Sequence, residues 1–322
     1  MCTLRAATPA AAAGEKGSPA KGAKAAAQAA QQPPATDSNV RYGDHERQML
    51  DFYKAKSATP TPLVFHIHGG GWVNGNKDRV ASVEKYLAAG ISVVSINYRL
   101  VPQAIAAKVQ PPVRWPLEDA ARALQFVRSR AREWNIDPQR IGATGGSAGA
   151  CSSLWLAFHA DMAQPKSTDP IARQSTRLWC AAVTGAQTTL DPKQMKEWTP
   201  NSRYGGHAFG FMDLANAKSR DTQFAEFLAA REKVLPWIKE YSPFEHVTSD
   251  DPPIYLIYAG PPAMGKEEKD PTHTANFGLK LQEKLRSVGV ENELVYPRAP
   301  EVKHPQISDF LIAKLKAPSA RR

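Results

Sequence analysis

The chain has 322 residues, 42% hydrophobic and 22% charged, which is the composition of an ordinary water-soluble protein with a sizeable core. No apolar run approaches the roughly 18 residues of a membrane-spanning helix, and three cysteines are too few for a disulfide framework or a zinc cluster. The net charge of +10 comes from Lys and Arg residues scattered among acids, so we expect no dedicated nucleic-acid partner.

Residues 1–37 are rich in Ala, Pro, Gly, Gln and Lys and nearly lack large apolar side chains. Such a segment cannot bury enough surface to offset the entropy lost on ordering, so we predict a disordered tail followed by one folded domain at 38–322. The tail lacks the apolar stretch of a secretory signal peptide. The sequence does not decide between a cytoplasmic protein and an exported protein whose signal peptide has been removed.

Two short alternating stretches at 40–42 and 48–53 predict a pair of antiparallel strands. Short apolar runs predict buried strands at 63–67, 91–96, 140–144, 178–183, 254–258 and 293–296. Helical patterns lie at 82–89, 117–134, 148–158, 277–287 and 307–315. Strands that alternate with helices predict an α/β fold, with a mostly parallel twisted sheet and helices on both faces.

A long cap-like insertion is predicted after the sixth strand, at about 187–247, where a simple unit needs only a short connection. It carries several aromatic residues, among them Trp198, Tyr204 and Phe209. These side chains either line a substrate pocket or pack the insertion onto the body, and the sequence does not decide between the two.

The segment Gly145-Gly146-Ser147-Ala148-Gly149 fits the pattern G-x-S-x-G, between a predicted strand and a predicted helix. In a sharp strand-to-helix turn, glycines make room for a strained backbone, and the serine hydroxyl stands at the sheet edge above the positive end of the helix. The pattern therefore predicts Ser147 as a nucleophile. A glycine-rich turn that only packs a helix onto the sheet is the alternative.

A second glycine cluster, His68-Gly69-Gly70-Gly71-Trp72, follows the strand predicted at 63–67. Residues without side chains allow backbone N–H groups to turn toward a site. Gly70, Gly71 and Ala148 are therefore predicted to form an oxyanion hole. A structural glycine turn is again the alternative, but the pairing of the two motifs favours a serine hydrolase.

The two motifs, HGGGW and GGSAG, occur in the order found in the hormone-sensitive-lipase-like α/β-hydrolases, which the chain resembles from about Val40 to Lys316. It looks most like compact bacterial esterases that start with paired strands, among which are carbohydrate and feruloyl esterases. The resemblance implies an α/β-hydrolase catalytic domain at 38–322. It also implies a serine carboxylesterase for small or short-acyl esters, which works through an acyl-enzyme and needs no cofactor.

A serine hydroxyl needs a histidine to take its proton and a carboxylate to orient that histidine. His304 lies after the last predicted strand and just before the C-terminal helix, which is the position of the base in the family, so His304 is the expected base. His273, in the loop after the strand at 254–258, is the main rival. His246 and His207 are less well placed, and a solvated loop histidine is the remaining alternative.

Asp270 is the expected acid, because it precedes the helix at 277–287 and resembles the Asp-Pro motif of the family there. The sequence departs from the family at this point, since residues 261–269 make the loop before Asp270 unusually long. Glu267 and Glu268 therefore stay open as alternatives, and a surface run of charges is a further one.

Other polar residues are expected to be structural: His66 as a buried, hydrogen-bonded side chain and Asp119 as a hydrogen-bond acceptor. No spacing of His, Glu and Asp suggests a metal site. Three other functions remain open: an amide hydrolase such as an arylformamidase, a carbohydrate acetyl or feruloyl esterase, and a non-catalytic binding module on a hydrolase fold. The sequence does not indicate the ester, the acyl length or the oligomeric state.

Overall fold

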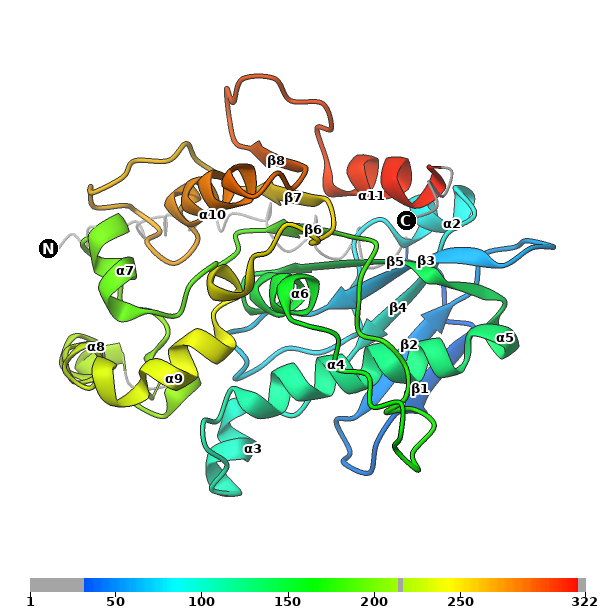
Figure 1. The fold of residues 1–322 in the computed structure, drawn as a ribbon, viewed down its shortest axis with the longest axis horizontal. Coiled ribbons are helices and arrows are strands. Elements are labelled where there is room, and N and C mark those ends of the chain that lie inside the picture. The colour runs from blue at the N-terminus through cyan, green and yellow to red at the C-terminus, as the bar shows by residue number, and fades with distance from the viewer. Residues whose placement is uncertain (1–31, 214–216, 318–322) are drawn as a thin grey trace, which may run out of the picture. The chain divides into compact units, whose positions relative to one another are not determined.

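Eight strands form one sheet in the computed structural model, which describes residues 32–213 and 217–317 (Figure 1). They are β1 (Asp37–Arg41), β2 (Met49–Tyr53), β3 (Thr61–Ile67), β4 (Ser92–Ile96), β5 (Ile136–Gly146), β6 (Cys180–Thr184), β7 (Ile254–Ile257) and β8 (Asn292–Val295). Each strand predicted from the sequence is present, and β5 begins earlier than expected.

The strand order is β1-β2-β4-β3-β5-β6-β7-β8. β2 runs antiparallel to β1 and β4, and every pair from β4 onward in that order is parallel. The prediction of a mostly parallel sheet is confirmed. Because β3 and β5 are neighbours, with Ile67 opposite Gly145, the two glycine motifs that follow these strands meet at one edge of the sheet.

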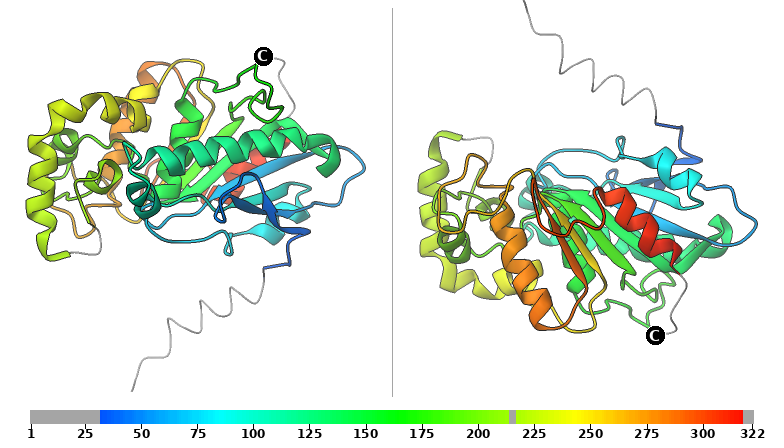
Figure 2. Two further views of the ribbon diagram at one scale, coloured as in Figure 1. Left: turned by 90° about the horizontal axis from the view of Figure 1, so that it is seen from below. Right: turned by 90° about the horizontal axis from the view of Figure 1, so that it is seen from above.

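Helices cover both faces of the sheet (Figures 1 and 2). One face carries α4 (Arg114–Ser129), α6 (Ala148–Phe158) and α10 (Ala275–Ser287), and the other carries α2 (Val83–Ala88) and α11 (Ile307–Lys316). Successive side chains of a strand point to opposite faces, so β3 contributes Phe65 to the first core and Val64 to the second. The short helices α3 (Val101–Ala106) and α5 (Ala131–Trp134) flank α4 along the chain.

Residues 187–247 connect β6 to β7 through short helices that gather beyond one end of the sheet, at the left of Figure 1. They are α7 (Pro192–Trp198), η1 (Gly206–Phe209), η2 (Ala217–Ser219), α8 (Arg220–Ala229), α9 (Arg231–Tyr241) and η3 (Pro243–His246). Trp198, Tyr204 and Phe209 are at most 7% exposed and belong to the same core as α4 and α6. These aromatic side chains therefore pack the segment onto the body.

The elements above belong to one compact unit, Pro33–Arg322. The tail predicted at 1–37 lies outside the described residues as far as residue 31, and its last residue, Asp37, begins β1. Among the residues that the structure describes, no helix has both the length and the apolar character needed to cross a membrane.

Candidate active site

Ser147 occupies the turn between β5 and α6, as the G-x-S-x-G pattern predicts. Its backbone has φ 54° and ψ −123°, a conformation that side-chain-bearing residues rarely adopt. The Ser147 N–H donates to the carbonyl oxygen of Thr184 at 3.1 Å, which holds the turn against β6. A Cβ atom on Gly149 would overlap the carbonyl oxygen of Ile67, so only glycine lets α6 begin this close to β3.

The loop after β3 carries the second glycine motif and turns sharply at Gly70, whose φ is +100°. The indole N–H of Trp72 donates to the Ser152 hydroxyl in α6 at 2.9 Å, which ties the loop to the helix that follows the nucleophile. Within residues 32–213 and 217–317, nothing accepts a hydrogen bond from the backbone N–H groups of Gly70, Gly71 or Ala148. The three predicted oxyanion donors are thus uncommitted.

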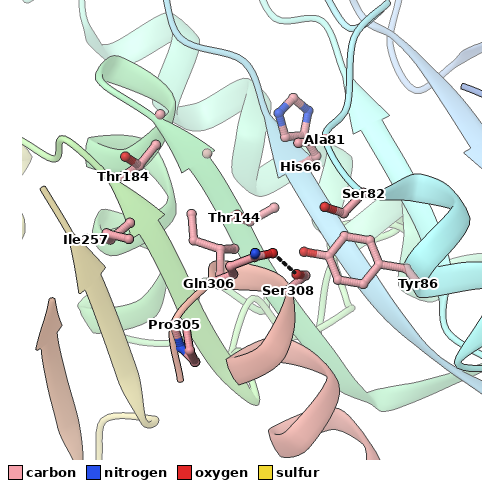
Figure 3. Close-up of a pocket in the computed structure, with 13 residues that line it drawn as sticks. His66, Ala81, Ser82, Tyr86, Thr144, Thr184, Ile257, Pro305, Gln306 and Ser308 are labelled. Atoms are coloured by element: carbon pink, nitrogen blue, oxygen red, sulfur yellow. Dashed lines mark hydrogen bonds between the residues drawn. The ribbon is translucent and has the colours of Figure 1, made fainter. Parts of the chain in front are cut away.

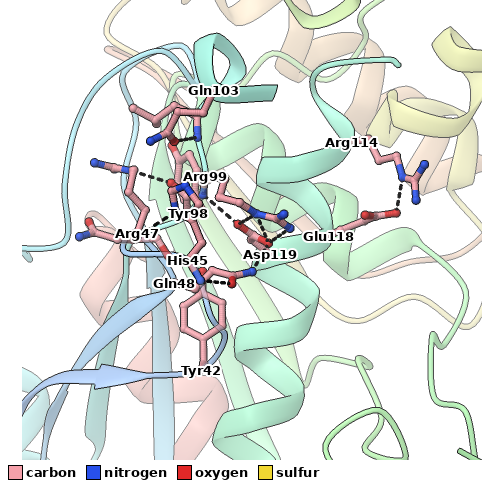
Figure 4. Close-up of polar contacts among 12 residues, drawn as sticks. Tyr42, His45, Arg47, Gln48, Tyr98, Arg99, Gln103, Arg114, Glu118 and Asp119 are labelled. Atoms are coloured by element: carbon pink, nitrogen blue, oxygen red, sulfur yellow. Dashed lines mark hydrogen bonds and ion pairs between the residues drawn. The ribbon is translucent and has the colours of Figure 1, made fainter. Parts of the chain in front are cut away.

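Arg47 and His68 fix the base of this loop. The His68 ring stacks on Tyr98 with 4.2 Å between centroids, and burial lowers the pKa of His68 to about 4, so the ring is neutral near pH 7. The Arg47 guanidinium donates to the carbonyl oxygen of Tyr98 at 2.8 Å (Figure 4). It also donates to the carbonyl oxygen of Gly75 at 2.8 Å, and its Nη2 lies 3.4 Å from His68 Nε2. These contacts hold the loop in addition to the hydrogen bond from Trp72 to α6.

Asp119 in α4 is the centre of a buried polar network (Figure 4). It is 1% exposed and accepts hydrogen bonds from the Arg99 backbone N–H, the Arg99 guanidinium and the Gln48 amide. Asp119 therefore connects α4 to the residue that precedes β2 and to the segment that follows β4. This is the structural role expected for it. His66 likewise forms a hydrogen bond between its Nδ1 and the Ser95 hydroxyl at 3.0 Å.

His273 is the histidine next to Ser147. The Ser147 hydroxyl lies 2.9 Å from His273 Nε2, and His273 Nδ1 lies 2.8 Å from Asp270 Oδ2. Burial opposes ionisation of Asp270, but hydrogen bonds from the His273 ring and from backbone N–H groups outweigh it and hold the pKa of Asp270 below its usual value. Ser147, His273 and Asp270 thus form one continuous hydrogen-bonded chain.

His304 does not occupy the position expected for the base. The loop between β8 and α11 carries its imidazole to Glu293 in β8, where Nδ1 lies 2.7 Å from the carboxylate, and within the described residues it makes no hydrogen bond to Ser147. The two other histidines considered from sequence lie elsewhere too. His207 packs against Trp72, and His246 Nε2 lies 2.6 Å from the carbonyl oxygen of Glu240.

The local sequence Asp270-Pro271-Thr272-His273 contains the signal that favours His273. The side chain of Asp270 accepts from the backbone N–H groups of Thr272 and His273, which curls the segment so that both side chains lie on one side. The two glutamates kept open as alternative acids do not contact His273 in the described part of the chain. Glu268 instead accepts from the Thr274 hydroxyl at 3.3 Å.

A pocket of about 700 Å³ opens over the nucleophile. Ser147 and His273 line it together with one glycine of each motif, Gly69 and Gly146, and Glu268, Lys269 and Thr274 add polar groups to the lining. A second cavity of about 330 Å³ lies beside it and shares Gly146 and Thr184 as walls. Figure 3 shows that the second cavity is lined by side chains of β3, β5 and β6, and by α2 and the start of α11.

Several curated proteins with similar sequences are named esterases. The chain is 25% identical to esterase LipQ of Mycobacterium tuberculosis over 284 residues, which cover 84% of this chain and 57% of the relative. It is 33% identical to gut esterase 1 of Caenorhabditis elegans over 48% of this chain and 28% of the relative, and 32% identical to an acetyl esterase of Salmonella schwarzengrund over 36% and 34%. The chain thus spans between about a quarter and three fifths of these relatives.

Solved structures share the fold at low sequence identity. A truncated carbohydrate esterase from gut microbiota has a TM-score of 0.62 at 20% identity, covering 89% of this chain and all of that one. An acetyl ester-xyloside bifunctional hydrolase from Caldicellulosiruptor lactoaceticus has a TM-score of 0.59 at 22% identity over 83% and 87%. Thermogutta terrifontis esterase 2, phosphoramylated by tabun, has a TM-score of 0.57 at 21% identity over 82% and 84%.

The BD-FAE family model matches residues 50–261, about two thirds of the chain. The matched range includes the HGGGW loop, Ser147 and the strands that hold them, and it ends before Asp270, His273 and His304. The assignment of the family therefore rests on the nucleophile side of the site. The chain belongs to the BD-FAE family of α/β-hydrolases.

Proposed function

We propose that this protein is a serine carboxylesterase that cleaves small or short-acyl esters. The observation that carries the proposal is the unbroken hydrogen-bonded chain from the Ser147 hydroxyl through His273 to Asp270. This hydrogen-bonded chain lies in a pocket of about 700 Å³. The backbone N–H groups of Gly70, Gly71 and Ala148, in the two glycine turns, have no hydrogen-bond acceptor among the described residues. Membership of the BD-FAE family and the esterase names of the curated relatives support the same activity.

In the proposed mechanism, His273 Nε2 accepts the proton of the Ser147 hydroxyl while the serine oxygen attacks the ester carbonyl carbon. Asp270 keeps the proton on His273 Nδ1 and stabilises the imidazolium that forms. The N–H groups of Gly70, Gly71 and Ala148 donate to the oxyanion of the tetrahedral intermediate. When the carbon–oxygen bond breaks, His273 returns the proton to the departing alcohol and leaves an acyl group on Ser147.

Deacylation repeats these steps with water. His273 takes a proton from a water molecule, whose oxygen attacks the acyl carbonyl, and the same N–H groups hold the second oxyanion. The collapse of this intermediate releases the carboxylic acid, and the proton on His273 returns to Ser147. No step uses a cofactor.

The proposal is tested by replacing Ser147 with Ala and measuring the hydrolysis of p-nitrophenyl acetate. We expect kcat to fall by at least about 10⁴-fold with unchanged thermal unfolding, because the loss of the nucleophile of a triad removes most of its rate enhancement. Ser287→Ala is the matched control, since its exposed hydroxyl only donates to the carbonyl oxygen of Lys284. Retained activity in Ser147→Ala would overturn the proposal.

A second candidate is the removal of acetyl groups from carbohydrates. It is favoured by two solved neighbours, a carbohydrate esterase and an acetyl ester-xyloside bifunctional hydrolase, and by the polar residues Glu268, Lys269 and Thr274 in the lining of the pocket. An acetylated xylo-oligosaccharide would then have a higher kcat/KM than p-nitrophenyl acetate. A sugar ester that is not cleaved would exclude this candidate and leave the general esterase proposal intact.

A further inference from the structure

Three possible metal ligands meet at the end of α6 that is farthest from Ser147. His159 directly follows α6, Glu240 lies in α9, and His246 ends η3. One ligand atom from each lies within 4.8 Å of the others. Imidazole nitrogens with a carboxylate are a donor set that suits Zn²⁺ and related divalent transition metals.

The hydrogen bonds of His159 indicate that one of its two ring nitrogens carries no proton in the neutral ring. Its Nδ1 lies 2.8 Å from the carbonyl oxygen of Ala160, which can only accept, so Nδ1 carries the proton of the neutral ring. The lone pair of Nε2 then faces the Glu240 carboxylate at 3.2 Å. Two acceptors repel each other at this distance unless a proton or a cation lies between them. The separation is close to the ~3.3 Å expected for two ligands of a tetrahedral zinc ion with bonds of about 2.0 Å.

His246 is arranged in the same way. Its Nε2 donates to the backbone carbonyl of Glu240 at 2.6 Å, which leaves Nδ1 as the nitrogen available to an ion. Its ring centroid lies 4.9 Å from that of His159. Histidines that bind metals usually donate their other N–H to a carbonyl or carboxylate, which fixes the tautomer and the direction of the lone pair. Both histidines meet this requirement without an ion.

The three side chains are held in place but stay open to solvent. The ring centroids of Trp155 and His159 lie 4.6 Å apart. The indole N–H of Trp155 donates to the backbone carbonyl oxygen of Glu240 at 2.8 Å. The side chains of His159 and Glu240 are 17% and 48% exposed, so an ion can reach them and water can complete its coordination.

We propose that His159, Glu240 and His246 form a binding site for a divalent transition-metal ion, with Zn²⁺ as the best match. The ion joins the connection between β6 and β7 to the C-terminal end of the helix that carries the nucleophile. Since the 11 residues of α6 separate it from Ser147 by about 16 Å, the ion is structural and takes no part in the reaction.

The test uses the full-length chain without an affinity tag, stripped with a chelator and titrated with Co²⁺ and Zn²⁺. We expect one Co²⁺ per chain with visible absorption bands, displacement of Co²⁺ by Zn²⁺, and a rise in the midpoint of thermal unfolding with Zn²⁺. Replacing His246 or His159 with Gln should weaken binding at least about 100-fold and abolish the thermal shift.

Two controls distinguish this site from other histidines. His45→Gln alters a histidine far from the cluster in sequence, and His273→Gln alters a histidine outside the cluster that is paired with a carboxylate, that of Asp270. Both should keep one equivalent of Zn²⁺ with unchanged affinity. The absence of stoichiometric binding, or binding that survives in His159→Gln and His246→Gln, would overturn the proposal, whatever the esterase activity.

Discussion

The backbone of Ser147 is the most informative feature at the level of single residues. A non-glycine residue at φ 54° and ψ −123° costs on the order of 1 to 3 kcal/mol, which surrounding contacts must offset. Here the contacts are the hydrogen bond of Ser147 to Thr184 and the close packing of β3 on the start of α6. The strained turn presents the hydroxyl to His273, so the strain serves the position of the nucleophile.

The choice between the two candidate bases can be made with matched variants. We predict that His273→Gln lowers kcat for p-nitrophenyl acetate by at least about 10³-fold, because glutamine cannot take the serine proton. His304→Gln should change kcat less than about threefold, since His304 is paired with Glu293. The opposite ranking in steady-state kinetics would transfer the role of base to His304.

The proposed role of Asp270 as the acid of the triad is tested in the same kinetic assay. Asp270→Asn should lower kcat by at least about 100-fold, because the amide no longer stabilises the imidazolium. We expect a smaller effect than for a buried triad carboxylate, since the Asp270 side chain is 64% exposed. Glu267→Gln is the control and should keep the activity of the unmodified protein. Equal losses in the two variants would contradict the role of Asp270.

The sequence predicts Ser147, the oxyanion glycines and Asp270 as members of the site, and the structure connects Ser147 to Asp270 through His273. The sequence favours His304 over His273, because His304 follows the last predicted strand, which is the position of the base in the family that the chain resembles. The contact depends on how the loop after β7 folds back over the sheet. In the sequence, only the close spacing of Asp270 and His273 indicates this contact.

At the scale of elements, the site depends on how closely α6 approaches β3. A Cβ atom at position 149 would collide with the backbone of Ile67 and His68. Because backbone atoms cannot move aside as a flexible side chain would, the helix and the oxyanion loop would have to separate. The geometry of the nucleophile and the stability of the fold are therefore linked at this contact.

Gly149→Ala should consequently lower both stability and activity. We expect a loss of at least about 2 kcal/mol in the free energy of unfolding, as for other overpacked core positions, measured by urea denaturation. Gly260→Ala is the control for stability, because a Cβ atom there meets nothing within 4 Å. Equal stability of the two variants would show that α6 can shift without cost.

The elements themselves were largely predictable, because buried strands and amphipathic helices leave short apolar runs and periodic patterns separated by Gly, Pro and Asn. The helices between β6 and β7 were not, since their packing depends on contacts with distant parts of the chain. The cluster of His159, Glu240 and His246 could not be predicted from the sequence for the same reason. Eighty residues separate its first two members, and no motif connects them.

At the scale of the whole molecule, three buried histidines should make the fold sensitive to acid. Burial lowers the pKa values of His66, His68 and His207 to about 4. The nearby backbone of Gly71 favours protonation of His207 slightly, but burial outweighs it. The unfolded chain binds these protons near pH 6.5 and the folded chain only near pH 4, so stability is complete above pH 6.5 and is lost progressively as the pH falls to 4.

His207→Phe tests this expectation. Between pH 7 and pH 4.5, its free energy of unfolding should fall by roughly 2 to 3 kcal/mol less than that of the unmodified protein, because one histidine that resists protonation has been removed. The phenyl ring keeps the contact with Trp72 that His207 makes at 5.8 Å between centroids. Parallel pH profiles in urea denaturation would contradict a buried neutral His207.

The most direct test of the central claim, that Ser147 is the nucleophile of an esterase, is peptide mass spectrometry after treatment with a fluorophosphonate. We predict one adduct per chain, located on Ser147 in the peptide that carries the GGSAG motif, with loss of p-nitrophenyl acetate hydrolysis in proportion to labelling. His273→Gln should be labelled far more slowly, and Ser147→Ala not at all. Full inactivation with the adduct on another residue, or no adduct in an active protein, would contradict the account.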